Sequence, residues 1–274
     1  MIANLFAPLI ETNLLLVWAV LFVLLAAAGE CGLRLERWRV SARQPVSAEQ
    51  KSGETERFSV STVTASLFAL LAFTLGLTIS FAENRFETRR DLVVQEANAI
   101  GTAWLRARLV GEPEGVAIAA LIEDYARVRL DFTASSNELD IPPLLARTGT
   151  LQTQMWRLTT DLARRTPTPI TASLFAALND MFDTSLAQRF AFASRLPAAL
   201  GWGMLLGSLI AIGGMGYLLG ATGNRQVALS TLSLLMWAGA LVLIIDFNRG
   251  RLGSIRVDPA PLVWTVQGFD SGAR

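Results

Sequence analysis

Four long apolar stretches interrupt an otherwise polar pattern along the chain. The first lies within residues 1–33, with its apolar run from Leu14 to Gly29, and the second covers residues 59–83. The third and fourth follow each other in residues 198–247, separated by a short turn that contains Gly and Asn. A helix of about 20 apolar residues crosses the ~30 Å hydrocarbon core of a bilayer. The pattern therefore predicts four transmembrane helices, the last two as a hairpin.

Residues 84–197, between the two pairs of apolar stretches, have a different pattern. They carry 13 Arg against 13 Asp and Glu, and apolar residues recur at helical spacing between Gly and Pro residues. We expect the helix of residues 59–83 to continue to Val110. Three more helices are expected after it, over residues 114–132, 144–165 and 171–196. No segment alternates as a strand would, so this region is predicted to be a soluble helical domain.

The predicted fold is an all-α integral membrane protein, in which four transmembrane helices in two pairs flank the soluble helical domain. Two segments complete this organisation. Residues 34–58 are polar and contain Pro45 and Gly53, which indicates a loop between the first two spans. Residues 248–274 are expected to form a C-terminal tail.

Composition agrees with a membrane protein and removes several kinds of enzyme chemistry. Hydrophobic residues make up 52% of the chain and charged residues 17%, with a mean hydropathy of +0.41. The chain has no His and a single Cys, Cys31, which excludes a His-containing catalytic triad, a His/Cys zinc site and an intrachain disulfide. We expect no enzyme activity, no cofactor and no bound metal. A net charge of +1 provides no basic surface to attract nucleic acid. The expected partner is the lipid bilayer, because of the four apolar stretches.

Basic residues near the predicted spans leave the orientation open. Those of the first loop favour a cytoplasmic loop and an external domain: Arg34, Arg37, Arg39, Arg43, Lys51 and Arg57. An equal number flanks the second and fourth spans on the domain side and favours the opposite orientation: Arg85, Arg89, Arg90, Arg249, Arg251 and Arg256.

Three sequence features resemble the bestrophin-like family of mainly bacterial membrane proteins. The most distinctive is RRDLVVQEANAIGTAWLRARL, from Arg89 to Leu109, and above all its EANAIGT stretch. The others are a Glu-x-Gly step at Glu30 and Gly32 and the closing IIDFNRGRLGSIRV from Ile244 to Val257. The chain is similar to this family over most of its length.

The resemblance implies kinship with bestrophins, which are pentameric ion channels with four membrane helices per subunit and a pore lined by the second. It therefore implies a homo-oligomer, a pentamer if the stoichiometry is shared, in the inner membrane of a bacterium, with ions as the transported species. Bestrophins keep their soluble helices in the cytosol, which conflicts with the charge of the first loop. The acidic calcium-binding cluster of animal bestrophins has no counterpart in this sequence.

One face of the second apolar stretch is small or polar at helical steps of three and four. It consists of Thr62, Ser66, Ala69, Phe73, Gly76, Ser80 and Asn84. One hypothesis is that copies of this face line a pore, in which hydroxyls replace part of an ion's hydration shell and Phe73 forms an apolar constriction. The alternative is close packing of small residues against another helix of the same subunit, which is the commoner use of such a face.

Charged residues at the ends of the spans are candidates for membrane ion pairs. Glu30 and Arg34 have the i, i+4 spacing of a helical pair. Asp246, at the end of the fourth span, is expected to pair with Arg249, Arg85 or Arg89, and the alternative is an ion or proton relay.

A polar row on the continued second helix consists of Gln95, Asn98, Thr102 and Arg106, with Glu96 on the neighbouring face. This row is predicted either to form the wall of a vestibule or to be an ordinary solvated or helix-packing surface. Two functions stay open. The chain is either an oligomeric ion channel with the second helix at its axis, or a non-conducting membrane scaffold or sensor whose helical domain binds a partner.

Overall fold

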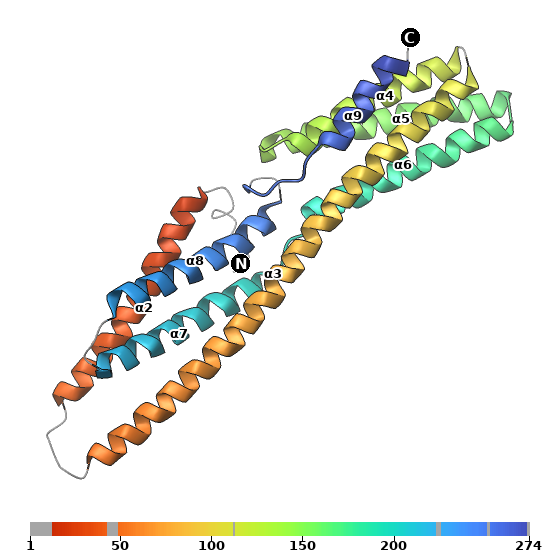
Figure 1. The fold of residues 1–274 in the computed structure, drawn as a ribbon. Helices are drawn as coiled ribbons and strands as arrows, with labels where there is room; N and C mark the ends of the chain where they lie inside the picture. The colour runs from red at the N-terminus through yellow and green to blue at the C-terminus, as the bar shows by residue number, and fades with distance from the viewer. Residues whose placement is uncertain (1–12, 43–48, 112, 223–225, 251–252, 273–274) are drawn as a thin grey trace. The chain divides into compact units, whose positions relative to one another are not determined.

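The computed structural model of the protein describes residues 13–42, 49–111, 113–222, 226–250 and 253–272 (Figure 1). It is helical and has no strand in these ranges, which confirms the all-α prediction. The helices are α2 (Leu14–Ala42), α3 (Glu49–Val110), α4 (Glu114–Ala134), α5 (Ile141–Arg165), α6 (Pro169–Ala193), α7 (Ala198–Thr222), α8 (Val227–Arg249) and α9 (Ala260–Gly272), with a 3-10 turn at Glu138–Asp140.

The described chain contains four helical segments that are long and apolar enough to cross a membrane, as predicted. They include α2, the first part of α3, α7 and α8. The chain divides into two compact units. The membrane unit comprises the residues up to Glu83 together with Leu196–Arg249, and the helical unit comprises Asn84–Arg195 together with the residues from Gly250 onward.

Glycines bring α2 and α7 together in the membrane unit. A Cβ atom on Gly32 of α2 would overlap the backbone of Gly213, and a Cβ on Gly216 would overlap the carbonyl of Gly29. A Cβ on Gly220 would lie 2.9 Å from a backbone oxygen of α2. Small residues at such a crossing let two helix backbones approach closely, and this packing provides the stability of helix pairs in lipid. By contrast, a Cβ on Gly201 would meet nothing within 4 Å.

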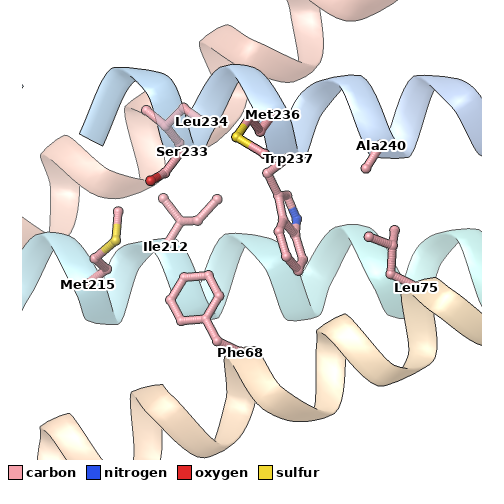
Figure 2. A pocket seen from close by; sticks show the side chains of 9 residues that line it. All are labelled: Phe68, Leu75, Ile212, Met215, Ser233, Leu234, Met236, Trp237 and Ala240. Atoms are coloured by element: carbon pink, nitrogen blue, oxygen red, sulfur yellow. The ribbon is translucent and has the colours of Figure 1, made fainter. Parts of the chain in front are cut away.

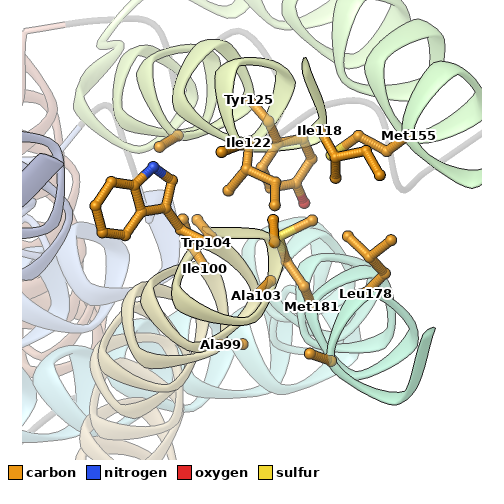
Figure 3. Close-up of a cluster of buried hydrophobic side chains, with 14 of the residues drawn as sticks. Ala99, Ile100, Ala103, Trp104, Ile118, Ile122, Tyr125, Met155, Leu178 and Met181 are labelled. Carbon is orange, nitrogen blue, oxygen red and sulfur yellow. The ribbon is translucent and has the colours of Figure 1, made fainter. Parts of the chain in front are cut away.

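The helical unit has a buried core to which α3, α4, α5, α6 and α9 all contribute (Figure 3). Its fully buried side chains include Ile100 of α3, Ile122 of α4, Met155 of α5 and Leu178 of α6. Thr168 caps the N-terminus of α6, because its hydroxyl oxygen accepts a hydrogen bond from the backbone N–H of Thr171. Pro169 occupies the first helical turn, where proline is tolerated.

Three boundaries differ from those predicted. Much of the expected loop 34–58 is helical, because α2 continues to Ala42 and α3 already begins at Glu49. Polar residues form helix readily once outside the lipid, and a single Gly such as Gly53 costs only about 1 kcal/mol. In addition, α5 begins before Pro142 and Pro143, since Pro is tolerated in a first helical turn.

The predicted tail also contains structure of its own. Helix α9 begins after Asp258, whose carboxylate accepts a hydrogen bond from the backbone N–H of Ala260 at 2.9 Å. Leu262 and Phe269 of this helix are buried in the core of the helical unit. The end of the described chain is therefore part of the helical unit.

Candidate functional site

Within the membrane unit, α3 has two faces of opposite character. One face packs on α7: Thr64, Leu71 and Thr78 are buried, with Thr64 against Gly214 and Leu71 against Gly207. The other face is exposed, and it carries the predicted pore-lining residues of this unit: Thr62, Ser66, Ala69, Phe73, Gly76 and Ser80. Asn84, the last residue of the predicted row, is also exposed and is the first residue of the helical unit. These side chains are exposed in the single chain, and whether they line a pore stays a prediction.

Two hydroxyl groups on the exposed face are bonded to their own helix. The hydroxyl of Thr62 donates to the carbonyl of Phe58 at 2.9 Å, and that of Ser66 donates to the carbonyl of Thr62 at 2.8 Å. These bonds satisfy the donors, and the oxygen lone pairs remain as acceptors on the surface. The face is therefore a row of small residues and acceptor oxygens, interrupted by Phe73, which is 65% exposed.

The exposed face of α3 is bordered by two different edges. On one side stand large apolar residues, all at least 45% exposed: Val63, Leu70, Leu77 and Phe81. On the other side stand the small residues Ala65 and Ala72, which are also exposed. This membrane helix thus presents a small and polar centre between a bulky edge and a smooth edge.

A cavity of about 500 Å³ lies in the membrane unit among α3, α7 and α8 (Figure 2). Phe68 of α3 and Trp237 of α8 meet beside it edge to face, with ring centroids 5.9 Å apart. The indole N–H of Trp237 donates to the hydroxyl of Ser208, which is buried on α7, at 2.7 Å. Sequence reasoning missed this link because nothing in the spacing of the three residues relates them.

The predicted membrane ion-pair residues lie in separate places. Glu30 accepts a hydrogen bond from Arg34 at 3.0 Å, and this pair is largely exposed. Asp246 and Arg249 are both buried, with 4% and 6% exposure, in the last turn of α8, where their charges interact. Helical spacing brings a residue and its third neighbour to the same side of the helix. A role of these two residues as a membrane ion pair stays a prediction.

The arginines predicted as further partners of Asp246 belong to the helical unit. Arg85 is half-buried, whereas Arg89 is 1% exposed. The Arg89 guanidinium donates to the carbonyls of Ala191 and Ser194 at 3.0 and 2.9 Å. These carbonyls belong to the C-terminal end of α6, where a cation is favoured by the helix dipole.

In the helical unit, the polar row predicted for a vestibule is largely exposed on α3. Gln95, Asn98 and Thr102 are exposed, and Arg106 is half-buried with a hydrogen bond of 2.8 Å to the carbonyl of Ser173 on α6. Three of the four residues therefore face away from the core, and the fourth links α3 to α6.

Glu96, on the neighbouring face of α3, is in a buried ion pair. Both of its oxygens accept hydrogen bonds from Arg129 of α4, and neither side chain has any exposure. Arg129 also donates to Gln188 of α6, whose amide donates to Thr133 at 3.4 Å. Burial raises the pKa of the Glu96 carboxyl, while the charge and the hydrogen bonds of Arg129 oppose that shift.

Tyr125 lies in the same core, and burial raises the pKa of its phenol. Together these groups join α3, α4 and α6, so Glu96 has a structural role. Sequence reasoning did not pair Glu96 with Arg129 because they lie 33 residues apart.

The bestrophin-like domain matches residues 39–262, which include most of the membrane unit and nearly all of the helical unit. The chain belongs to the bestrophin-like family. No curated protein and no solved structure matches it. With four helices in its described residues able to cross a lipid bilayer, this bestrophin-like protein is a multi-pass membrane protein of a family that includes ion channels.

Proposed function

We propose that this bestrophin-like protein forms an oligomeric ion pore in which the exposed face of α3 surrounds the axis. The observation that supports it is the exposure of Thr62, Ser66 and Ser80 together with the small residues between them, while Thr64 and Thr78 on the opposite face are buried. A helix that faced only lipid would gain nothing from a row of hydroxyls and a glycine along its exposed centre.

The chemistry of the face suits an ion that keeps part of its water. Threonine and serine oxygens can replace some hydration contacts, and none of these residues carries a charge that would bind an ion tightly. Phe73 stands in the middle of the row and is 65% exposed. In a ring of subunits, a circle of such side chains is an apolar constriction, which gates by excluding water.

The two edges of the face support a ring. In a closed cyclic oligomer each helix meets two neighbours through different surfaces, so the interface is heterologous. The bulky edge of one α3, with Leu70 and Leu77, is complementary to the smooth edge of the next, with Ala65 and Ala72. Large side chains set against small ones interdigitate and allow close packing. We propose five subunits in the ring, because the related bestrophins are pentamers.

Accessibility of the two faces tests the proposal directly. Cys31 is the single cysteine of the chain, so Cys31→Ser gives a background in which new cysteines can be placed one at a time. Thr62→Cys and Ser66→Cys should react with a charged, water-soluble thiol reagent in reconstituted vesicles. The matched controls Thr64→Cys and Thr78→Cys replace hydroxyl residues of the same helix whose side chains are buried, and should be at least tenfold slower. Equal rates on both faces, or no reaction on either, would discard the pore.

Conduction itself is tested at the proposed constriction. Phe73→Ala should increase ion leak through proteoliposomes. A ring of alanine methyl groups would leave a wider opening at the axis than a ring of phenyl groups. The control Phe81→Ala changes the same residue type on the bulky edge, which is proposed to contact a neighbour instead of the axis. An unchanged current in Phe73→Ala beside a measurable wild-type current would remove Phe73 as the gate.

One observation favours the alternative of a non-conducting sensor. Helix α3 is continuous from Glu49 to Val110 and contributes residues to both units, as in proteins that transmit a signal along one helix. Particle images of the purified protein separate the two functions. A symmetric ring with an axial hole supports the pore, and a monomer or dimer supports the sensor.

A further inference from the structure

The membrane unit has a second groove, which is apolar over most of its length and polar at one end. It is a groove of about 780 Å³ between α2 and α7, with Val60 of α3 at its edge. Its walls are mostly apolar, and Leu35 and Ile210 at the rim are 54% and 62% exposed. Gly32 and Gly213 line it where the backbones of the two helices approach closely.

One end of this groove is polar and carries a cation. Arg39 and Tyr217 both line it, and the Arg39 guanidinium donates to the Tyr217 hydroxyl at 2.6 Å. Glu36, which is 4% exposed, interacts with the same hydroxyl and helps to hold this end in place. The lining is therefore apolar over most of the groove and polar at its end, where the Arg39 guanidinium lines it and Glu36 is buried behind it.

The length of α2 is sufficient to carry this polar end to the depth of lipid headgroups. From Leu14 to Trp38, α2 rises roughly 36 Å, slightly more than the ~30 Å hydrocarbon core. Trp38 is 72% exposed, and exposed Trp residues gather at the membrane interface. The end of α2 is also basic, because Arg34, Arg37 and Arg39 lie within two turns. Such a cluster attracts anionic lipid, each Arg contributing about 1 kcal/mol near the surface.

We propose that this groove binds an anionic glycerophospholipid, with one acyl chain along α2 and α7 and the phosphate at Arg39. A second copy of the protein would need to bring a carboxylate to headgroup depth beside Arg39, whereas an anionic leaflet supplies a phosphate there in every lipid. The site lies on α2 and α7 and not on the exposed face of α3, so it does not depend on conduction.

The native Cys31 reports on occupancy, because it lines the groove and is exposed. Its reaction with N-ethylmaleimide, which is uncharged, is measured on the full-length protein in mild detergent. Added phosphatidylglycerol should slow the reaction about fivefold relative to the same amount of phosphatidylcholine, as expected for one arginine contact. Native mass spectrometry of the same wild-type sample should show bound phosphatidylglycerol.

Matched variants locate the phosphate. Arg39→Gln should abolish the difference between the two lipids. Arg37→Gln removes an equally basic, exposed neighbour that does not line the groove, and should retain the difference. Equal slowing by both lipids, equal slowing by inorganic phosphate alone, or protection retained in Arg39→Gln would overturn the proposal. Protection that follows protein concentration without added lipid would assign the groove to a second copy.

Discussion

The buried pair of Glu96 and Arg129 allows a quantitative prediction about the helical unit. Both side chains have 0% exposure, and both carboxylate oxygens are bonded to the guanidinium. Removing one partner leaves the other charge in a low-dielectric core, which costs about 3–5 kcal/mol. Glu96→Leu and Arg129→Met should each lower the free energy of unfolding by that amount. Replacing both residues at once removes both charges and should cost less than the sum of the single changes.

The assay is thermal unfolding of the full-length protein in detergent, followed by intrinsic tryptophan fluorescence, to which Trp104 in the same core contributes. A loss of ~3 kcal/mol lowers the melting temperature of a domain of this size by about 10 °C. The double variant should recover at least a third of the summed loss, which is the signature of direct coupling.

An exposed ion pair of the same unit provides the control. Arg127 and Asp124 on α4 lie 3.1 Å apart but are each about half exposed, so Arg127→Ala should cost well under 1 kcal/mol. The reasoning fails if Glu96→Leu costs no more than Arg127→Ala. It also fails if the losses of the two single variants simply add, because the pair would then contribute no more than two separate side chains.

Three further predictions concern packing, charge and pH. Gly216→Val should reduce the yield of monodisperse protein in gel filtration because its Cβ would overlap the α2 backbone, whereas Gly203→Val, with nothing within 4 Å, should not. Asp246→Asn should lower the free energy of unfolding by ~3 kcal/mol, and with it the unfolding temperature, because the charge of the buried Arg249 is then less well compensated. Normal stability with altered transport would instead indicate a relay. Because burial raises the pKa of Tyr125 above its ordinary value near 10, its contribution to stability is complete below pH 10 and is lost as the pH rises. Denaturant titrations should therefore show that Tyr125→Phe loses less stability above pH 10 than the wild type, by up to ~1.4 kcal/mol per pH unit.

Helix positions could be predicted from the sequence because local patterns determine them. Apolar length located the four membrane helices, and periodicity located α4, α5 and α6 to within a few residues. The same periodicity placed the row from Thr62 to Ser80 on one face of α3, and these residues are exposed together. Their place at a pore axis remains a prediction, because it depends on neighbouring copies of the chain.

Features that depend on contacts distant in sequence could not be predicted. The partner of Glu96 lies on another helix, and the indole of Trp237 finds Ser208 only when α7 and α8 pack together. No spacing rule relates such residues. One missed element did have a local signal: Asp258 followed by Pro259 is a typical helix start, and it precedes α9.

The glycine contacts between α2 and α7 also bear on how the membrane unit can move. At Gly29 and Gly216 the two backbones are in direct contact, so no side chain lies between them there that could slide or change rotamer. Helix α3, in contrast, rests on α7 through the side chains of Thr64 and Leu71, which can adjust. Any opening or closing inside the membrane should therefore move α3 relative to a rigid α2–α7 pair. A covalent crosslink between α3 and α7 should prevent that motion.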